Sequence, residues 1–270
     1  MSTPYPTFEL GEQLTREQIE HFETHGFLHF RNFIDAAQVR ALIDASLEVQ
    51  RQWVAEGREK INGVPIKYGK DLDGGAIVQR FAFANLHHPV LARFLDDPRF
   101  RTLFPLIGTD DTRIGHHEKD GMVINHYVHA PGSAYSRLGW HTDGLRDIFL
   151  GTRLNPLLNV GVHLSNLGPE HGGLRLLPGT HRQGLWQMLF RKRYFLDHDD
   201  DPREVAIIPA AGDLTVHDGR LWHRVAQSTV SGEASRRRVI YIPVISGRYA
   251  PKSEKSPTPL YQRFASITNK

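Results

Sequence analysis

Six short runs of strand-forming residues follow one another in the second half of this 270-residue chain. They cover residues 122–129, 157–164, 173–177, 205–208, 213–217 and 237–244. Clusters of glycine, proline, asparagine and aspartate separate the runs and mark turns between them. Short strands in regular succession are typical of a sandwich or a barrel. We therefore expect a β core over residues 121–248.

The first third of the chain has helical signals instead. Thr15 is followed by Gln18 at the third helical position, which forms a capping box, and Gly26 ends this first helix. Asp35 caps a second helix whose apolar residues recur at helical spacing. A third helical stretch covers residues 88–104. Helices first and strands afterwards indicate an α+β fold.

The chain contains no internal repeat and no linker of biased composition, so residues 1–270 are expected to form a single domain. Within it, residues 1–120 are mainly helical and residues 121–248 form the β core. Residues 183–204 are charged and rich in aromatic side chains, and they form either a lid over a site or an inserted surface loop. Residues 249–270 form a tail.

The composition excludes several classes of protein. Because the chain has no cysteine, it cannot form disulfides, thiolate nucleophiles or cysteine-based zinc and iron–sulfur sites. No apolar run approaches the roughly 18 residues that a membrane helix needs, and residues 1–6 lack the pattern of a signal peptide. The net charge is +3, but the basic residues are dispersed and form no nucleic-acid motif. We expect a cytoplasmic protein that binds neither nucleic acid nor membrane and needs no obligate protein partner.

The segment Trp140-His141-Thr142-Asp143 has the spacing of a metal site. Residues two apart on a strand point to the same face, so His141 and Asp143 can converge on one ion. An imidazole nitrogen and a hard carboxylate suit Fe(II), and one more histidine completes a facial triad with open positions. His223 is the expected third ligand, because a turn and a strand before it carry the chain back across the β core.

Taken in chain order, these motifs resemble the phytanoyl-CoA dioxygenase-like branch of the Fe(II)/2-oxoglutarate oxygenases. The matching segments are Leu14-Thr15 to Gly26-Phe27-Leu28, Trp140-His141-Thr142-Asp143, Gly172-Gly173 to Pro178-Gly179-Thr180-His181, Gly212-Asp213 and His223. The ordered set is far more specific than any one segment. The resemblance implies a double-stranded β-helix, a jelly-roll or cupin-like core, with the N-terminal helices packed on it and iron at its open end.

The resemblance also implies an arginine on the strand after His223, where its guanidinium pairs with the far carboxylate of 2-oxoglutarate. Arg236, Arg237 and Arg238 lead into an apolar strand, and the family pattern favours Arg237. Alternation along a strand places Arg236 and Arg238 on the opposite face from Arg237. Only one of these two faces can serve the co-substrate.

A polar side chain on the run 122–129 is implied to reach the oxoglutarate or the substrate. His126 suits the inward register, and Asn125, on the other face, is the alternative. The chain departs from many relatives two positions after His223, where Val225 replaces a small hydroxyl residue. One contact to oxoglutarate is therefore expected to be absent.

The implied activity is that of a dioxygenase that requires Fe(II), 2-oxoglutarate and O₂. Such an enzyme hydroxylates or otherwise oxidises a C–H bond of a small organic molecule, such as a secondary metabolite, an amino-acid derivative or an acyl compound, and releases succinate and CO₂. Two other readings use the same scaffold. A cupin-like metal-dependent hydrolase or isomerase would share the three ligands without needing Arg237, and a non-catalytic binding protein would not need an intact ligand set.

Overall fold

The computed structural model describes residues 5–131, 137–145 and 154–258. The first four residues and residues 259–270 of the expected tail lie outside this part of the chain. The helices are α1 (Arg16–His25), α2 (Ala36–Ala55), α3 (Pro89–Leu95) and α5 (Leu185–Phe190), with 3₁₀ turns at Ala84–Leu86, Pro98–Leu106, Pro169–His171 and Thr180–Arg182. Among the described residues, no helix combines the length and apolar character needed to span a membrane.

Local signals place the N-terminal helices where they were predicted. The Thr15 and Gln18 side chains form the reciprocal bonds of a capping box at the start of α1, and Gly26 ends the helix in the left-handed region, with a φ of 81°. Asp35 caps α2 in the same manner. The third helical stretch divides into α3 and the 3₁₀ turn Pro98–Leu106.

Two antiparallel sheets form the body of the protein. The larger has the strand order β1-β12-β9-β14-β7-β5-β4, and β6 pairs with β14 beside it. These strands are β1 (Phe27–Phe30), β4 (Lys67–Lys70), β5 (Ala76–Phe81), β6 (Arg113–Ile114), β7 (Val123–His129), β9 (Leu157–His163), β12 (Leu214–Asp218) and β14 (Gly232–Ile245). The smaller sheet has the order β11-β10-β13-β8. Its strands are β8 (Leu138–His141), β10 (Gly173–Leu176), β11 (Val205–Ala206) and β13 (His223–Ala226), while β2 (Lys60–Ile61) and β3 (Val64–Pro65) form a separate pair.

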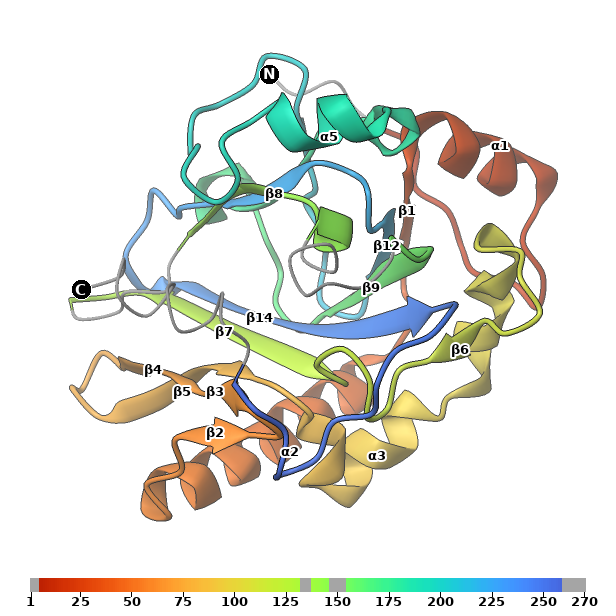
Figure 1. Ribbon diagram of the computed structural model, residues 1–270. Coiled ribbons are helices and arrows are strands. Elements are labelled where there is room, and N and C mark those ends of the chain that lie inside the picture. Colours follow the sequence, from red (N-terminus) through yellow and green to blue (C-terminus); the bar gives the residue numbers. More distant parts are fainter. Residues whose placement is uncertain (1–4, 132–136, 146–153, 259–270) are drawn as a thin grey trace.

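Helices α2 and α3 cover one face of the larger sheet and the smaller sheet lies across the other (Figure 1). The main hydrophobic core lies on the helical side, where α2 and α3 pack on the sheet through side chains such as Leu42, Trp53 and Leu91. The predicted α+β class with a jelly-roll core and packed N-terminal helices is therefore confirmed. The hairpin β4–β5, which widens the larger sheet, was not predicted from the sequence.

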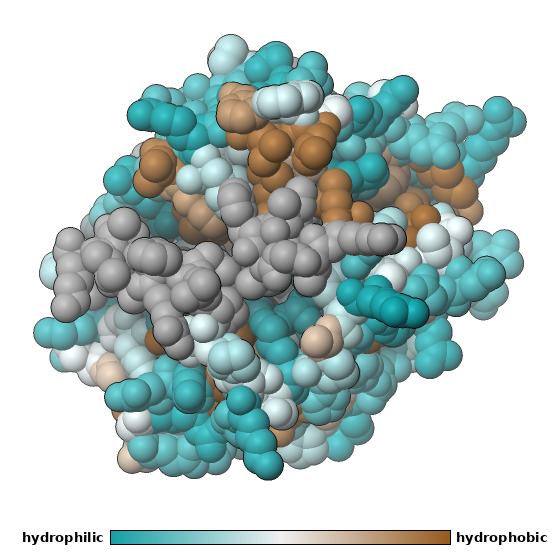
Figure 2. Space-filling view, in the orientation of Figure 1, coloured by the Kyte–Doolittle hydropathy of each residue, from teal (hydrophilic) through white to brown (hydrophobic). Residues whose placement is uncertain are grey.

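The segment 183–204 forms α5 and a loop on the far side of the smaller sheet (Figure 1). The Phe195 N–H donates to the Trp140 carbonyl, and the Trp140 N–H donates to the Asp197 carbonyl, so the loop lies along β8. On its outer side, Trp186 stacks on Phe190, and both side chains are more than 70% exposed. Figure 2 shows apolar residues gathered at the top of the molecule, where Figure 1 places α5.

Candidate metal centre and its pocket

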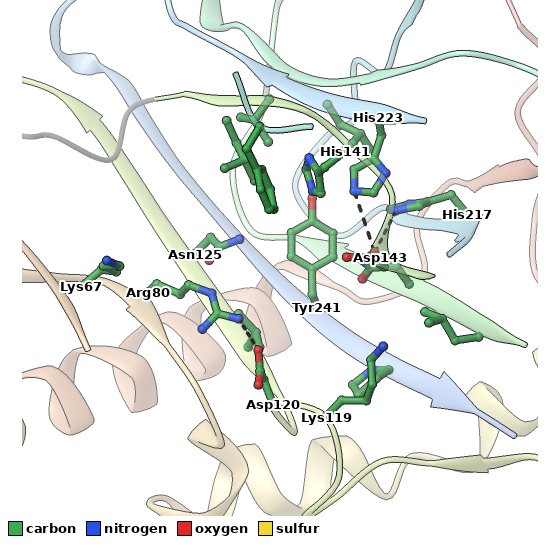
Figure 3. A pocket seen from close by; sticks show the side chains of 18 of the residues that line it. Lys67, Arg80, Lys119, Asp120, Asn125, His141, Asp143, His217, His223 and Tyr241 are labelled. Atoms are coloured by element: carbon green, nitrogen blue, oxygen red, sulfur yellow. Dashed lines mark hydrogen bonds and ion pairs between the residues drawn. The ribbon is translucent and has the colours of Figure 1, made fainter. Parts of the chain in front are cut away.

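A pocket of about 230 Å³ lies between the two sheets. His141, Asp143 and His223 line it together with side chains from β4, β5, β7, β9 and β14. Figure 3 shows the three residues converging at one end of the pocket. They form a cluster that could hold a metal ion, with one ligand atom from each residue and all three atoms within 4.8 Å of one another.

The two histidines are held by strand pairing. His141 is the last residue of β8 and His223 is the first residue of β13, and the two are direct register partners. Their ring centroids are 4.1 Å apart. Each Nδ1 lies within hydrogen-bond distance of a backbone carbonyl two residues earlier, at 2.8 Å from the Gly139 oxygen and 2.9 Å from the Leu221 oxygen. An imidazole whose Nδ1–H donates to a carbonyl presents the Nε2 lone pair, which is the state that ligates a metal.

Asp143 follows β8 by two residues and completes the cluster. Its Oδ2 atom is 3.8 Å from Nε2 of His223. The Nδ2 group of Asn159 on β9 donates to the same oxygen at 2.9 Å. A hydrogen bond from outside the cluster fixes the orientation of a ligating carboxylate and is a common feature of metal sites. Two imidazole nitrogens and one carboxylate on the rim of a pocket fit a facial Fe(II) site with open positions.

A third histidine lies behind the cluster. His217 on β12 is fully buried, its ring centroid is 4.6 Å from that of His223, and its Nε2 is 3.9 Å from Oδ2 of Asp143. Burial, together with the neighbouring His223, holds its pKa well below the usual histidine value, so the ring is neutral. The register His217↔Asn159 explains why it reaches the site.

Arg237, which the family pattern favoured, lies on the face of β14 that is turned toward the smaller sheet. It is 4% exposed, its guanidinium lies 4.7 Å above the ring of Tyr127, and burial lowers its pKa. Gly173 faces it, because a Cβ at that position would lie 3.3 Å from Nη1 of Arg237. Its neighbours Arg236 and Arg238 have the opposite orientation, and Arg236 pairs with Asp71 on the outer side.

The inward register expected for His126 is wrong. Asn125 and Tyr127 line the pocket, whereas Nε2 of His126 lies 2.8 Å from Nη1 of Arg236 on the other face of β7. Ile124 shares the face of His126 and belongs to the main core, so this face of β7 packs toward the helices. The alternative, Asn125, therefore occupies the inward position.

Several residues that line the pocket belong to no motif that can be recognised in the sequence. Tyr194 and Phe195 of the segment 183–204 line the pocket, and the Phe195 ring stacks on His141 with centroids 4.9 Å apart. Lys67 and Arg80 come from the unpredicted hairpin β4–β5. Only the pairing of these strands with β7 brings them to the site, so no local pattern could have found them.

Comparisons with known proteins agree with this geometry. Residues 22–237 match the model of the phytanoyl-CoA dioxygenase (PhyH) family. Ectoine dioxygenases of Bordetella bronchiseptica and Bordetella parapertussis are each 24% identical over 180 residues, which is 66% of this chain and 53% of the relative. The chain thus aligns with about half the length of these relatives.

Solved structures show the same fold at low identity. The carbocyclase SnoK from nogalamycin biosynthesis has a TM-score of 0.64 at 17% identity, covering 97% of this chain and 94% of that protein. EvdO2 from Micromonospora carbonacea var. aurantiaca, complexed with 2-oxoglutarate, has a TM-score of 0.61 at 19% identity, covering 93% of this chain and 98% of that protein. Because the family model matches most of the chain, the protein belongs to the phytanoyl-CoA dioxygenase family.

Proposed function

We propose that this protein is an Fe(II)- and 2-oxoglutarate-dependent dioxygenase that oxidises a C–H bond of a small organic molecule. His141, Asp143 and His223 would hold the iron, and Arg237 would bind the far carboxylate of 2-oxoglutarate. When bound, iron and 2-oxoglutarate together supply O₂-dependent oxidation with release of succinate and CO₂. The observation that carries the proposal is the direct register pairing of His141 with His223, with Asp143 beside them and an open pocket in front.

The protein's own residues account for binding and orientation. Asn159 donates to Oδ2 of Asp143 and so would orient the carboxylate toward a bound ion. Asn125, on the inner face of β7, is the polar side chain we assign to the co-substrate or substrate in place of His126. Phe195 covers one face of the His141 ring and helps to keep water from the centre.

The guanidinium of Arg237 supports a role toward the co-substrate. It is held inside the barrel between Tyr127 and the glycine face of β10, and an arginine fork matches a carboxylate with two parallel hydrogen bonds. A metal-dependent hydrolase on this scaffold would have no use for a buried guanidinium at this point. The family membership and the solved structure of EvdO2 with 2-oxoglutarate favour the oxygenase reading over that alternative.

The names of the relatives support a small polar or cyclic substrate. Two are ectoine dioxygenases, and similar folds include a carbocyclase and an epimerase of nogalamycin biosynthesis. A pocket of about 230 Å³ is compatible with a molecule of that size. Residues 183–204, which bring Tyr194 and Phe195 to the pocket, are proposed to act as its lid.

The test uses protein purified without oxygen and supplied with Fe(II) and 2-oxoglutarate. We expect the charge-transfer absorption of the bound co-substrate and, after air is admitted, succinate formation that depends on both additions. In His141→Ala, we expect succinate formation to fall more than about 100-fold, because loss of a group that only orients a ligand already costs about 10–100-fold. His116→Ala, a substitution outside the pocket, is the control. A wild-type protein that neither binds nor turns over 2-oxoglutarate would leave the hydrolase or a binding role as the better reading.

A further inference from the structure

The side of the pocket opposite the metal centre is basic. Figure 3 shows Lys67, Arg80 and Lys119 on this side, with His141 and His223 across the cavity. One carboxylate, that of Asp120, lies among the three cations. The proposed iron ligands are at the other end, so these charges are not needed to hold the metal.

Strand pairing builds this wall. Val239 on β14 pairs with Asn125 on β7, Asn125 pairs with Arg80 on β5, and Arg80 pairs with Lys67 on β4. Directly paired residues of adjacent strands have side chains on the same face of a sheet. The row therefore continues the inner face of the larger sheet from the barrel out to its edge, with Lys67 at the end.

Arg80 already has a partner. Its Nη2 lies 2.7 Å from Oδ2 of Asp120, and Nζ of Lys252 lies 3.0 Å from the other oxygen. The buried carboxylate is thus shared by two cations from opposite sides. Arg80 and Asp120 form a fixed part of the wall.

Lys67 differs from these residues. It is half-buried, and within residues 5–131, 137–145 and 154–258 its ammonium group makes no hydrogen bond or ion pair. Burial lowers its pKa, and the neighbouring positive charge of Arg80 lowers it further. A cation held in a pocket beside another cation is unfavourable unless something of opposite charge binds there.

We propose that this basic wall, with Lys67 as the recognition residue, binds an anionic group of the substrate, which is an organic molecule with an apolar body and a carboxylate or phosphate. The apolar body fits the rest of the pocket, where Val123, Leu174, Val225 and Pro243 are among the lining residues. This inference rests on the proposed function only in taking the pocket as the substrate site. It specifies the substrate class, which the family membership does not.

Matched pairs of probes test the proposal. Phenylpropanoate, phenylbutanoate and phenylhexanoate are compared with their amides, and the corresponding phosphate monoesters with their alcohols, by calorimetry on protein loaded with Fe(II) and 2-oxoglutarate without oxygen. The wild type is expected to bind at least one anion about tenfold or more tightly than its neutral partner. The two arms of the panel distinguish a carboxylate from a phosphate.

Three variants test whether the preference for the anion depends on Lys67. Lys67→Met should abolish the preference for the anion, and Lys67→Arg should retain it. Lys70→Met is the matched control, because Lys70 is an exposed lysine on the same strand that does not line the pocket. Removing the unpartnered Lys67 ammonium leaves no carboxylate unpaired, so the midpoint of thermal unfolding should change little.

Several outcomes would overturn the proposal. One is a wild type that binds no anion more tightly than its neutral partner, and another is a preference that survives Lys67→Met. A third is weaker binding of 2-oxoglutarate in Lys67→Met, which would assign the lysine to the co-substrate. Failure of the proposed function is distinguishable, because the charge-transfer absorption would then be missing in the wild type, while calorimetry would still report the anion preference.

Discussion

The two faces of β14 contact different parts of the molecule although their residues alternate along one strand. Ile240, Ile242 and Val244 point toward α2 and α3, and each is fully buried in the main core. On the other face, Tyr241 lines the cavity between the sheets, and Arg237 lies over the ring of Tyr127 beside Gly173 of the smaller sheet. One strand therefore contributes both to the stability of the fold and to the chemistry of the site.

The buried polar groups of the site lower the stability of the fold, and the apolar face of the same strand raises it. Burying the guanidinium of Arg237 and the neutral ring of His217 opposes folding, because both groups lose water that the protein does not fully replace. The helical face has no comparable buried charge at these positions and gains free energy from apolar burial. We infer that substitutions on the two faces separate into effects on ligand binding and effects on stability.

The largest effect on ligand binding is expected from a substitution of Arg237. Arg237→Met should weaken 2-oxoglutarate binding by at least about 30-fold, because truncating one partner of a buried charged pair costs about 2–5 kcal/mol. Titration of the charge-transfer absorption measures the change. Arg236→Met is the control on the adjacent, opposite face, where the side chain pairs with Asp71 and Glu233. Equal loss of binding in both variants would contradict the assignment of Arg237.

At Ile240, three residues further along β14, we expect a loss of stability without a loss of 2-oxoglutarate binding. Ile240→Ala removes a fully buried side chain from the helical face and should lower the free energy of unfolding by about 2–5 kcal/mol. Denaturant titration measures this loss. The dissociation constant of 2-oxoglutarate for the folded fraction should stay within about twofold. A large change in that constant without a loss of stability would show that the two faces are not independent.

Sequence reasoning found the metal cluster because its information is local. His141 and Asp143 are two residues apart, and His223 was found from its order after the Gly-Asp turn at Gly212. The helix ends were also predictable, because Thr15, Gln18 and Gly26 satisfy backbone groups within one turn. The fold class followed from the order of helices and strands.

The errors arise where the choice depends on distant strands. Alternation establishes that Asn125 and His126 face opposite ways, but both faces of β7 are buried, so polarity did not identify the inner one. Lys67 and Arg80 are 13 residues apart on a hairpin with little apolar alternation. They reach the pocket because Arg80 pairs with Asn125 and Lys67 pairs with Arg80. Such contacts depend on how strands that are distant in the sequence pair with one another, and a short segment of sequence does not predict that pairing.

A smaller effect is expected from the residue that orients Asp143. Asn159→Ala removes the hydrogen bond to Oδ2 and should weaken metal binding by about 10–100-fold, the usual cost of losing such a partner. Titration with Fe(II) under anaerobic conditions, followed by calorimetry, gives the affinity. Asn155→Ala, outside the pocket, serves as the control. Unchanged affinity in Asn159→Ala would mean that strand pairing alone positions the carboxylate.

The smallest predicted effect concerns His126, on the face of β7 away from the pocket. Burial first, and then the charges of Arg238 and Arg236, lower the pKa of His126 to about 3, and the bond from Arg236 requires an unprotonated Nε2. The unfolded chain takes up this proton near pH 6.5, whereas the folded protein does not. The contribution of His126 to stability is therefore complete above pH 6.5 and is lost, by about 1.4 kcal/mol per pH unit, as the pH falls toward 3.

His126→Gln should make the fall in unfolding free energy between pH 6 and pH 4 shallower by about that amount, because glutamine cannot take up the proton in either state. Denaturant titrations at several pH values measure both slopes, and the difference between the two proteins isolates His126 from other buried histidines whose pKa is lowered, such as His163 and His217. Binding of 2-oxoglutarate at pH 7.5 should be unchanged. If the variant instead has the wild-type pH slope and binds 2-oxoglutarate weakly, then His126 acts in the pocket, and the division of β7 into a helical face and a cavity face is wrong at this residue.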